Sequence, residues 1–129
     1  NMDEVAQYGP LSPVMFTGQM TAYTAYCPGC IGKVACPPAQ DVRNGNIYYE
    51  DSSYGTVRIL AADRKIPCGS IIKISNLTFS NEPILGIVLD RGGAIKGNII
   101  DFLVEERSEA YDDIGRQRNV IFEIIRWGW

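Results

Sequence analysis

Apolar runs of strand length recur along the chain, and glycine and proline residues separate them. Residues 16–26 are rich in Thr, Tyr and Met without helical periodicity, and the later runs contain many β-branched residues. Short runs of this kind, bounded by turn-forming residues, are typical of β-strands. The pattern therefore predicts strands at residues 16–26, 56–62, 70–75, 84–89, 99–104 and 120–125.

One stretch, residues 106–114, has a helical pattern, with Ser108 as a candidate cap and Gly115 as a stop signal. Half a dozen short strands with one short helix indicate a mainly β fold. Closure of the sheet would remove its exposed strand edges, which otherwise invite pairing with other chains. We therefore predict a small closed β-barrel that carries one short helix.

The length of 129 residues fits one domain, and the 46% hydrophobic content suffices for a core. Glycine, prolines and scattered apolar residues mark residues 1–14 as a linker or tail, which leaves 15–129 as the domain. A net charge of −3 argues against a nucleic-acid partner, and no apolar run is long enough to span a bilayer. The chain has no histidine, which excludes His-based catalytic triads and His-ligated metal sites.

Four cysteines bear on the cellular compartment. Cys27, Cys30 and Cys36 lie in CPGCIGKVAC, and Cys68 lies in KIPCGS. An even count in a small domain fits two disulfides and an oxidising compartment, and we take Cys27–Cys30 with Cys36–Cys68 as the expected pairing. Zinc ligation and free thiols are the alternatives, although zinc sites normally use two paired CxxC units. A thiol-redox role for Cys27 and Cys30 would need a helix to lower a thiol pKa, and none is predicted there.

Three aspartates are attached to apolar strands. Asp63 ends TVRILAAD, Asp90 ends ILGIVLD, and Asp101 lies inside NIIDFLV. Burial raises the pKa of a carboxyl group, and a second carboxylate nearby raises it further. Two carboxyls separated in this way supply one neutral acid and one ionised partner, the arrangement that cleaves glycosidic bonds. The alternative is structural, because aspartates at strand ends often accept hydrogen bonds from turn amides.

A glycine-rich turn, GGAIKG, contains Gly92, Gly93 and Lys96. It lacks the spacing of a phosphate-binding loop, and no helix follows it. Lys96 could contact a substrate oxygen or lie in solvent as an ordinary turn lysine. The tyrosines, Tyr23 among them, could line a sugar groove or pack in the core.

Three longer segments carry a resemblance to a known family. LAADRKIPCGSIIKI, GIVLDRGGAIKGNIIDFLV and EAYDDIGRQRNVIFEII resemble the 3D domain, named for its three aspartates. That domain occurs in stationary-phase survival and resuscitation-type proteins and is related to membrane-bound lytic transglycosylase A. MTAYTAYCPGC is similar to the first strand of the family. The chain departs from the family pattern at three positions, Arg64, Cys68 and Arg91.

The resemblance implies a six-stranded double-psi β-barrel that cleaves the MurNAc–GlcNAc bond of peptidoglycan without water. It implies that Asp101 is the catalytic acid and Asp90 its partner. Asp63, Thr21, Tyr23, Gly92, Gly93 and Lys96 are then candidate substrate contacts. No metal or other cofactor is expected for this chemistry.

The expected partner is a peptidoglycan glycan strand. The expected location is the bacterial cell envelope or exterior, with targeting, anchoring or wall-binding segments outside these residues. Two other functions remain open. One is an inverting glycoside hydrolase on the same barrel, and the other is an expansin-like module that binds cell-wall glycan without cleaving it.

Overall fold

The computed structural model describes residues 14–25, 32–37, 39–43, 45–92, 95–105 and 114–128. The strands within these residues are β1 (Val14–Tyr23), β2 (Tyr48–Asp51), β3 (Gly55–Ala61), β4 (Ile71–Ser75), β5 (Ile84–Asp90), β6 (Ile99–Leu103) and β7 (Gln117–Arg126). Residues 106–113 of the predicted helix and residues 1–13 of the predicted tail lie outside the described residues. No helix among the described residues is long and apolar enough to cross a membrane.

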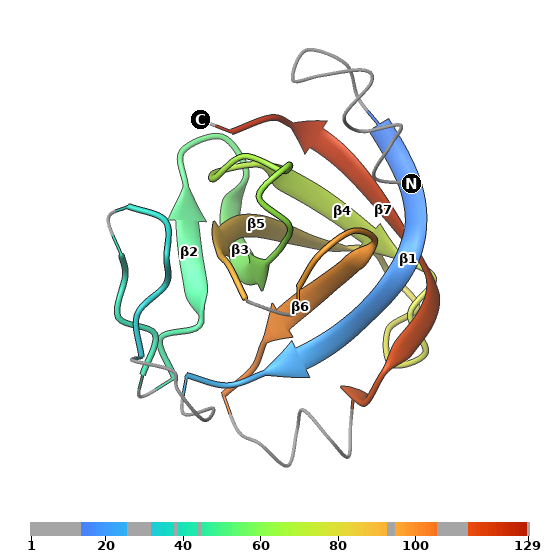
Figure 1. Ribbon diagram of the computed structural model, residues 1–129, viewed down its shortest axis with the longest axis horizontal. Coiled ribbons are helices and arrows are strands. Elements are labelled where there is room, and N and C mark those ends of the chain that lie inside the picture. The colour runs from blue at the N-terminus through green and yellow to red at the C-terminus, as the bar shows by residue number, and fades with distance from the viewer. Residues whose placement is uncertain are drawn as a thin grey trace.

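Six of the strands form a closed barrel. The sheet order is β2-β3-β5-β4-β7-β1-β6, and β6 pairs back onto β3, which closes the ring (Figure 1). The pairs β1–β6 and β3–β5 are parallel, and the other pairs within the ring are antiparallel. The mainly β, six-stranded double-psi barrel predicted from the sequence is confirmed.

Each predicted strand is present, with ends that differ by up to three residues. The sequence pattern missed β2, which forms a hairpin with β3 on the outside of the ring. Its four residues, YYED, are too few and too polar for a clear alternation of apolar and polar positions.

Two hydrophobic layers hold the barrel together. One fills the barrel interior, with Met20, Leu60, Ile100 and Phe102 at most 1% exposed. The second lies on the outer face of the barrel wall, where Ile59, Ile87, Leu89 and Leu103 pack under residues of the segment between β1 and β2. We name this segment, residues 32–37, 39–43 and 45–47, the covering segment. Burial of apolar surface on both faces explains why the strands read as nearly continuous apolar runs.

A close backbone approach brings β1 onto β6. Gly18 lies at a register shift in the pairing of β1 with β7, one residue before β1 begins to pair with β6. The N–H of Gln19 donates to the carbonyl of Asn98 at 3.0 Å. A Cβ atom at Gly18 would lie 1.9 Å from that same carbonyl oxygen. Only glycine permits this approach without a backbone shift, and the β1–β6 pairing then sets the register of the site.

Candidate functional site

Four side-chain positions lie in a row across four neighbouring strands. Thr21 of β1 pairs with Asp101 of β6, Asp101 pairs with Ala61 of β3, and Ala61 pairs with Asp90 of β5. We name these four residues the aspartate row. Residues paired across a sheet point to the same face, so the two carboxyl groups flank the small methyl side chain of Ala61. Two strand spacings separate the aspartate Cα atoms by about 10 Å.

The row faces away from the barrel interior. Ile100 and Phe102, which flank Asp101 in β6, are both members of the interior layer, so alternation directs Asp101 outward. In β5 a bulge achieves the same result. Leu60 pairs with Val88 while Ala61 pairs with Asp90, so Leu89 is the extra residue. The extra residue turns Asp90 to the outer face, as β-bulges beside functional sites commonly do.

Asp101 is half-buried and carries a perturbed acid group. Desolvation raises its pKa from the ordinary 3.8 to about 6, and the negative charge of Asp90 adds to this shift. The Thr21 hydroxyl donates to Asp101 Oδ1 at 2.9 Å and opposes part of the shift. The backbone N–H of Phe102 also hydrogen-bonds to this carboxyl group and opposes part of the shift, but the net direction stays upward.

Asp90 accepts three hydrogen bonds, from three separate segments. The Tyr23 hydroxyl donates to Oδ2 at 2.8 Å, and the N–H groups of Ala35 and Arg91 donate to Oδ1 at 3.0 and 2.9 Å. Burial raises the pKa of Tyr23 well above its usual value, and the charges of Asp90 and Asp101 raise it further. Tyr23 therefore stays a neutral hydrogen-bond donor, and its phenol lies close to both aspartates.

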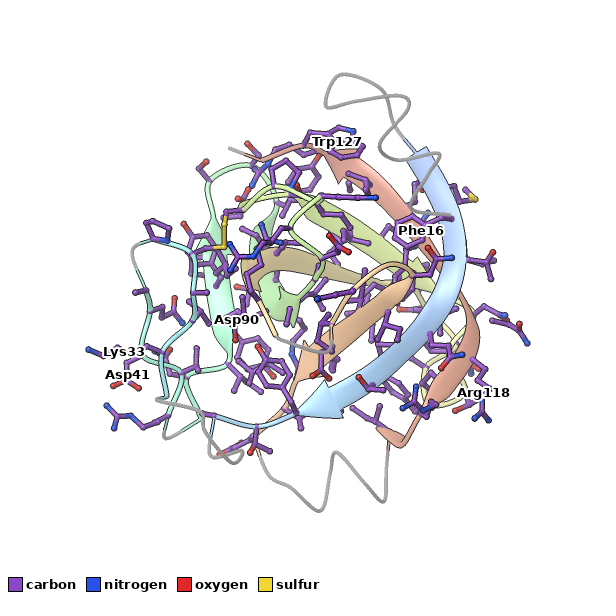
Figure 2. The ribbon with its side chains drawn as sticks, in the orientation of Figure 1. Phe16, Lys33, Asp41, Asp90, Arg118 and Trp127 are labelled. Carbon is purple, nitrogen blue, oxygen red and sulfur yellow. A yellow bond between two sulfur atoms is a disulfide. The ribbon has the colours of Figure 1, made fainter. Side chains whose placement is uncertain are left out.

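A groove of about 520 Å³ borders the row on the Asp90 side. Ala35, Asp63, Arg64, Arg91, Gly92 and Lys96 are among the residues that line it, and we name it the cationic groove. It adjoins Asp90 because Ala35 and Arg91 both line the groove and bind the Asp90 carboxylate. Figure 2 shows Asp90 between the covering segment and the barrel wall, on the side opposite Arg118.

Asp63 lies in this groove and not in the row. Its Oδ2 accepts the N–H of Gly97 at 2.7 Å, and its Oδ1 accepts the N–H of Lys65 at 2.9 Å. Burial alone would raise the pKa of Asp63, but these two hydrogen bonds and the charges of Lys65 and Arg91 together outweigh it, so the net shift is downward. Asp63 thus stays ionised and holds the turn that contains Lys96.

The covering segment is anchored beside Asp90 by a disulfide. Cys36 and Cys68 are joined, as predicted, and the yellow bond in Figure 2 marks this link between the covering segment and the barrel. The Cys36 N–H also donates to the Leu89 carbonyl at 2.8 Å, next to the Ala35 N–H that binds Asp90. The disulfide therefore fixes one of the three donors to Asp90. The predicted partners Cys27 and Cys30 lie outside the described residues.

Removal of this disulfide is expected to destabilise the domain and loosen the site. A Cys36→Ala/Cys68→Ala double variant should lose about 2–4 kcal/mol of unfolding free energy, because the cross-link closes a loop with a sequence separation of 32. Urea denaturation measures the loss. Hydrogen exchange of the Ala35 and Cys36 amides should accelerate more than exchange in β4. Unchanged stability together with unchanged exchange at Ala35 would contradict this anchoring role.

The structure brings together Thr21, Tyr23, Asp90 and Asp101, and it places Gly92 and Lys96 with Asp63 in the groove. Gly93 lies outside the described residues. Sequence reasoning missed Ala35, whose contribution is a backbone N–H, and Ala61, whose contribution is its small size. The sequence offers one weak indication of the role of Ala61. It is one of two alanines just before Asp63 in TVRILAAD, and small side chains leave room for a ligand beside a carboxylate. Among the described residues, no group of three or more Asp, Glu or Cys side chains is arranged to hold a metal ion.

The chain is similar to two curated proteins of Bacillus subtilis (strain 168). It is 36% identical over 92 residues to the SPbeta prophage-derived uncharacterized protein YorM, and 33% identical over 98 residues to the putative cell wall shaping protein YabE. These matches cover 70% and 75% of this chain. The chain spans only 34% and 20% of the respective relatives.

Two solved structures are also similar. A mutant Clavibacter michiganensis expansin in complex with cellohexaose matches 88% of this chain and 51% of its own, with a TM-score of 0.53 and 10% identity, a likeness of fold alone. The E. coli lytic transglycosylase MltA matches 59% of this chain and 26% of its own, with a TM-score of 0.45 and 24% identity, which is too low for a structural conclusion. The family model described as the 3D domain matches residues 58–125, more than half of the chain. The resemblance drawn from the sequence is thereby confirmed, and the chain belongs to the 3D domain family.

Proposed function

We propose that this domain is a peptidoglycan lytic transglycosylase that cleaves the β-1,4 bond between MurNAc and GlcNAc. The observation that carries the proposal is the aspartate row. Asp101, whose pKa is raised to about 6, stands across Ala61 from Asp90, which accepts three hydrogen bonds. One neutral acid beside one ionised carboxylate is the pairing that glycosidic cleavage requires.

In the first step, Asp101 acts as the general acid. Its protonated carboxyl donates the proton to the glycosidic oxygen as the bond to the anomeric carbon breaks. The muramoyl ring then carries positive charge in an oxocarbenium-like state. Asp90 is fixed by Tyr23, Ala35 and Arg91, so its negative charge stabilises that state with little reorganisation.

In the second step, Asp101 acts as the base. The ionised carboxylate takes the proton of the C6 hydroxyl on the same sugar, and the C6 oxygen closes onto the anomeric carbon. The product is a 1,6-anhydro-muramoyl end, and Asp101 recovers its proton. The nucleophile belongs to the reacting sugar, so its effective concentration is high and no water-activating group is needed.

The cell envelope or exterior is the proposed site of action. The disulfide Cys36–Cys68 fits an oxidising compartment, and one relative bears the name of a putative cell wall shaping protein. Because the chain spans only a part of its relatives, we propose that neighbouring segments of a longer protein anchor it or bind the wall.

The masses of the soluble products test this proposal. Purified sacculi incubated with the domain should release fragments with 1,6-anhydro ends, which lack the mass of one water relative to reducing ends. Reducing ends alone would contradict transglycosylation. That result would show hydrolysis instead, and inverted configuration at the new anomeric carbon would assign the inverting hydrolase, in which two carboxyls about 6.5–9.5 Å apart hold a water between them. The Cα separation of about 10 Å across the aspartate row does not distinguish the two reactions, so the products must decide.

A non-catalytic glycan-binding module is the second candidate. The likeness of fold to an expansin, over 88% of this chain, favours it. In that case the domain would sediment with sacculi and release no soluble fragments at any pH. Any anhydro product that depends on Asp101 would exclude this candidate.

A further inference from the structure

The cationic groove has a charge opposite to that of the whole chain. Three cationic side chains, Arg64, Arg91 and Lys96, line it together with one carboxylate, Asp63. The chain as a whole has a net charge of −3. A positive cleft on an acidic protein concentrates anions locally, because like-charged surfaces elsewhere repel them.

Among the described residues, no ion pair within 4.0 Å involves these three cationic side chains, although the charges of Asp63 and Asp90 act on Arg91. Within the part of the chain that the structure describes, the ion pairs join Arg43 to Asp41 and Arg126 to Asp51. Asp63, the one carboxylate in the groove, has both oxygens occupied by backbone N–H groups. Even with the adjoining Asp90 counted beside Asp63, the three cationic side chains outnumber the carboxylates among the described residues at this groove.

Arg91 is held rigidly within the groove. Its Nη1 donates to the carbonyls of Ala62 and Asp63 at 3.1 and 2.8 Å, and its Nη2 approaches Cys68 Sγ at 3.6 Å. A guanidinium fixed in this way loses little conformational freedom when its remaining N–H groups bind an oxyanion. Arg64 and Lys96 are exposed, line the same groove and can supply further charge.

We propose that the cationic groove binds a carboxylate of the peptide substituent that the glycan substrate carries. This inference rests on the proposed function, because it takes peptidoglycan as the substrate. The groove begins at Asp90, so a glycan whose scissile bond lies at the aspartate row would place a neighbouring substituent there. The groove would then select acidic, peptide-bearing glycan over neutral polysaccharide.

Binding measured without cleavage tests the inference. In the Asp101→Asn background, the double substitution Arg64→Gln/Lys96→Gln should weaken sedimentation with intact sacculi by about three- to ten-fold. Lys73→Gln, which removes an exposed lysine from β4, is the matched control and should bind as the background does. Arg91 is left in place because its guanidinium also holds the carbonyls of Ala62 and Asp63.

Chemically altered sacculi identify the ligand. Amidation of all substrate carboxyls should weaken binding of the background protein and abolish its difference from the double variant. Removal of the peptides with an amidase hydrolyses the amide to the sugar and so frees a new carboxylate there. Binding that is lost on this treatment assigns the peptide carboxylates, whereas binding that persists until the freed carboxyls are also amidated would overturn the peptide assignment. Equal binding to amidated and intact sacculi, or equal binding by the double variant and the control, would overturn the inference.

Failure of the groove assignment can be distinguished from failure of the proposed transglycosylase function. If the unsubstituted domain releases no anhydro products yet binds sacculi through Arg64 and Lys96, the function fails and the groove assignment stands. If cleavage occurs and the charge dependence is absent, the groove assignment fails alone.

Discussion

An Asp101→Asn variant is expected to release anhydro products from sacculi about 10²–10⁴-fold more slowly than the unsubstituted domain. The amide cannot donate the proton that the glycosidic oxygen needs, nor take one from the C6 hydroxyl. Release of soluble fragments, quantified by mass, measures the effect. Glu82→Gln, which removes an exposed carboxylate from the turn before β5, is the matched control and should retain full activity. Full activity of the Asp101 variant would remove the central assignment.

The cleavage rate of the unsubstituted domain should depend on pH through the protonation of Asp101. The pKa of Asp101 is raised to about 6, so the acid is mostly protonated below that pH and its protonated fraction falls about tenfold per unit above it. Cleavage should decline correspondingly as the pH rises through 6. A rate that is flat between pH 5 and about 8 would contradict the role of Asp101 as the acid.

The raised pKa of Asp101 also predicts that the Asp101→Asn variant is more stable than the unsubstituted domain. The folded protein holds the Asp101 proton more tightly than the unfolded chain does, so the stabilising contribution is full below about pH 4 and is lost as the pH rises through 6. Asn resembles the neutral acid at every pH. The Asp101→Asn variant should therefore be more stable than the unsubstituted domain at pH 7, by about 2 kcal/mol. Loss of activity with gain of stability separates a catalytic role from a structural one.

An Arg126→Met variant is expected to lose about 3–5 kcal/mol of unfolding free energy at pH 7. Arg126 of β7 binds both oxygens of Asp51 at 2.7 and 2.8 Å and donates to the carbonyl of Gly69 at 2.7 Å. Asp51, at the end of β2, is only 7% exposed, so the substitution leaves a buried carboxylate without its counter-charge. Urea denaturation measures the loss, and Arg118→Met on the exposed side of the same strand is the control.

The same pair predicts how stability changes in acid. Hydrogen bonds from Arg126 lower the pKa of Asp51 from 3.8 to about 2. The contribution of the pair is therefore present above about pH 4 and is lost as the pH falls through 2. The unsubstituted domain should lose stability over this interval, and the Arg126 variant should lose less. Equal losses in both proteins would show that the pair contributes little.

The strands of the barrel could be predicted because each is a local apolar run of sufficient length. The candidate acid and its partner could also be singled out, since Asp90 and Asp101 stand in apolar surroundings. Their proximity could not be derived from local pattern, because it depends on the pairing of β3 with both β5 and β6. Only the resemblance to the 3D domain supplied that relation.

The covering segment is the part that sequence reasoning could not place. Its residues give no strand or helix periodicity, and its position depends on the Cys36–Cys68 disulfide and on backbone hydrogen bonds to Leu89 and Asp90. A backbone donor such as the Ala35 N–H cannot be recognised from the residue type, because every residue except proline has one. The cationic groove was missed for a related reason, since Arg64, Arg91 and Lys96 converge only through the turns that follow β3 and β5.

The extra residue in β5 has a consequence for how relatives of this chain should be compared. Leu89 can change to another apolar residue and Asp90 will still face outward, whereas loss of one residue between Gly86 and Asp90 would turn the carboxylate toward the interior. The orientation of Asp90 therefore depends on the number of residues in this strand as much as on their identity. Where a homologue has one residue fewer in this strand, its aligned aspartate should not be assumed to have the same role as Asp90.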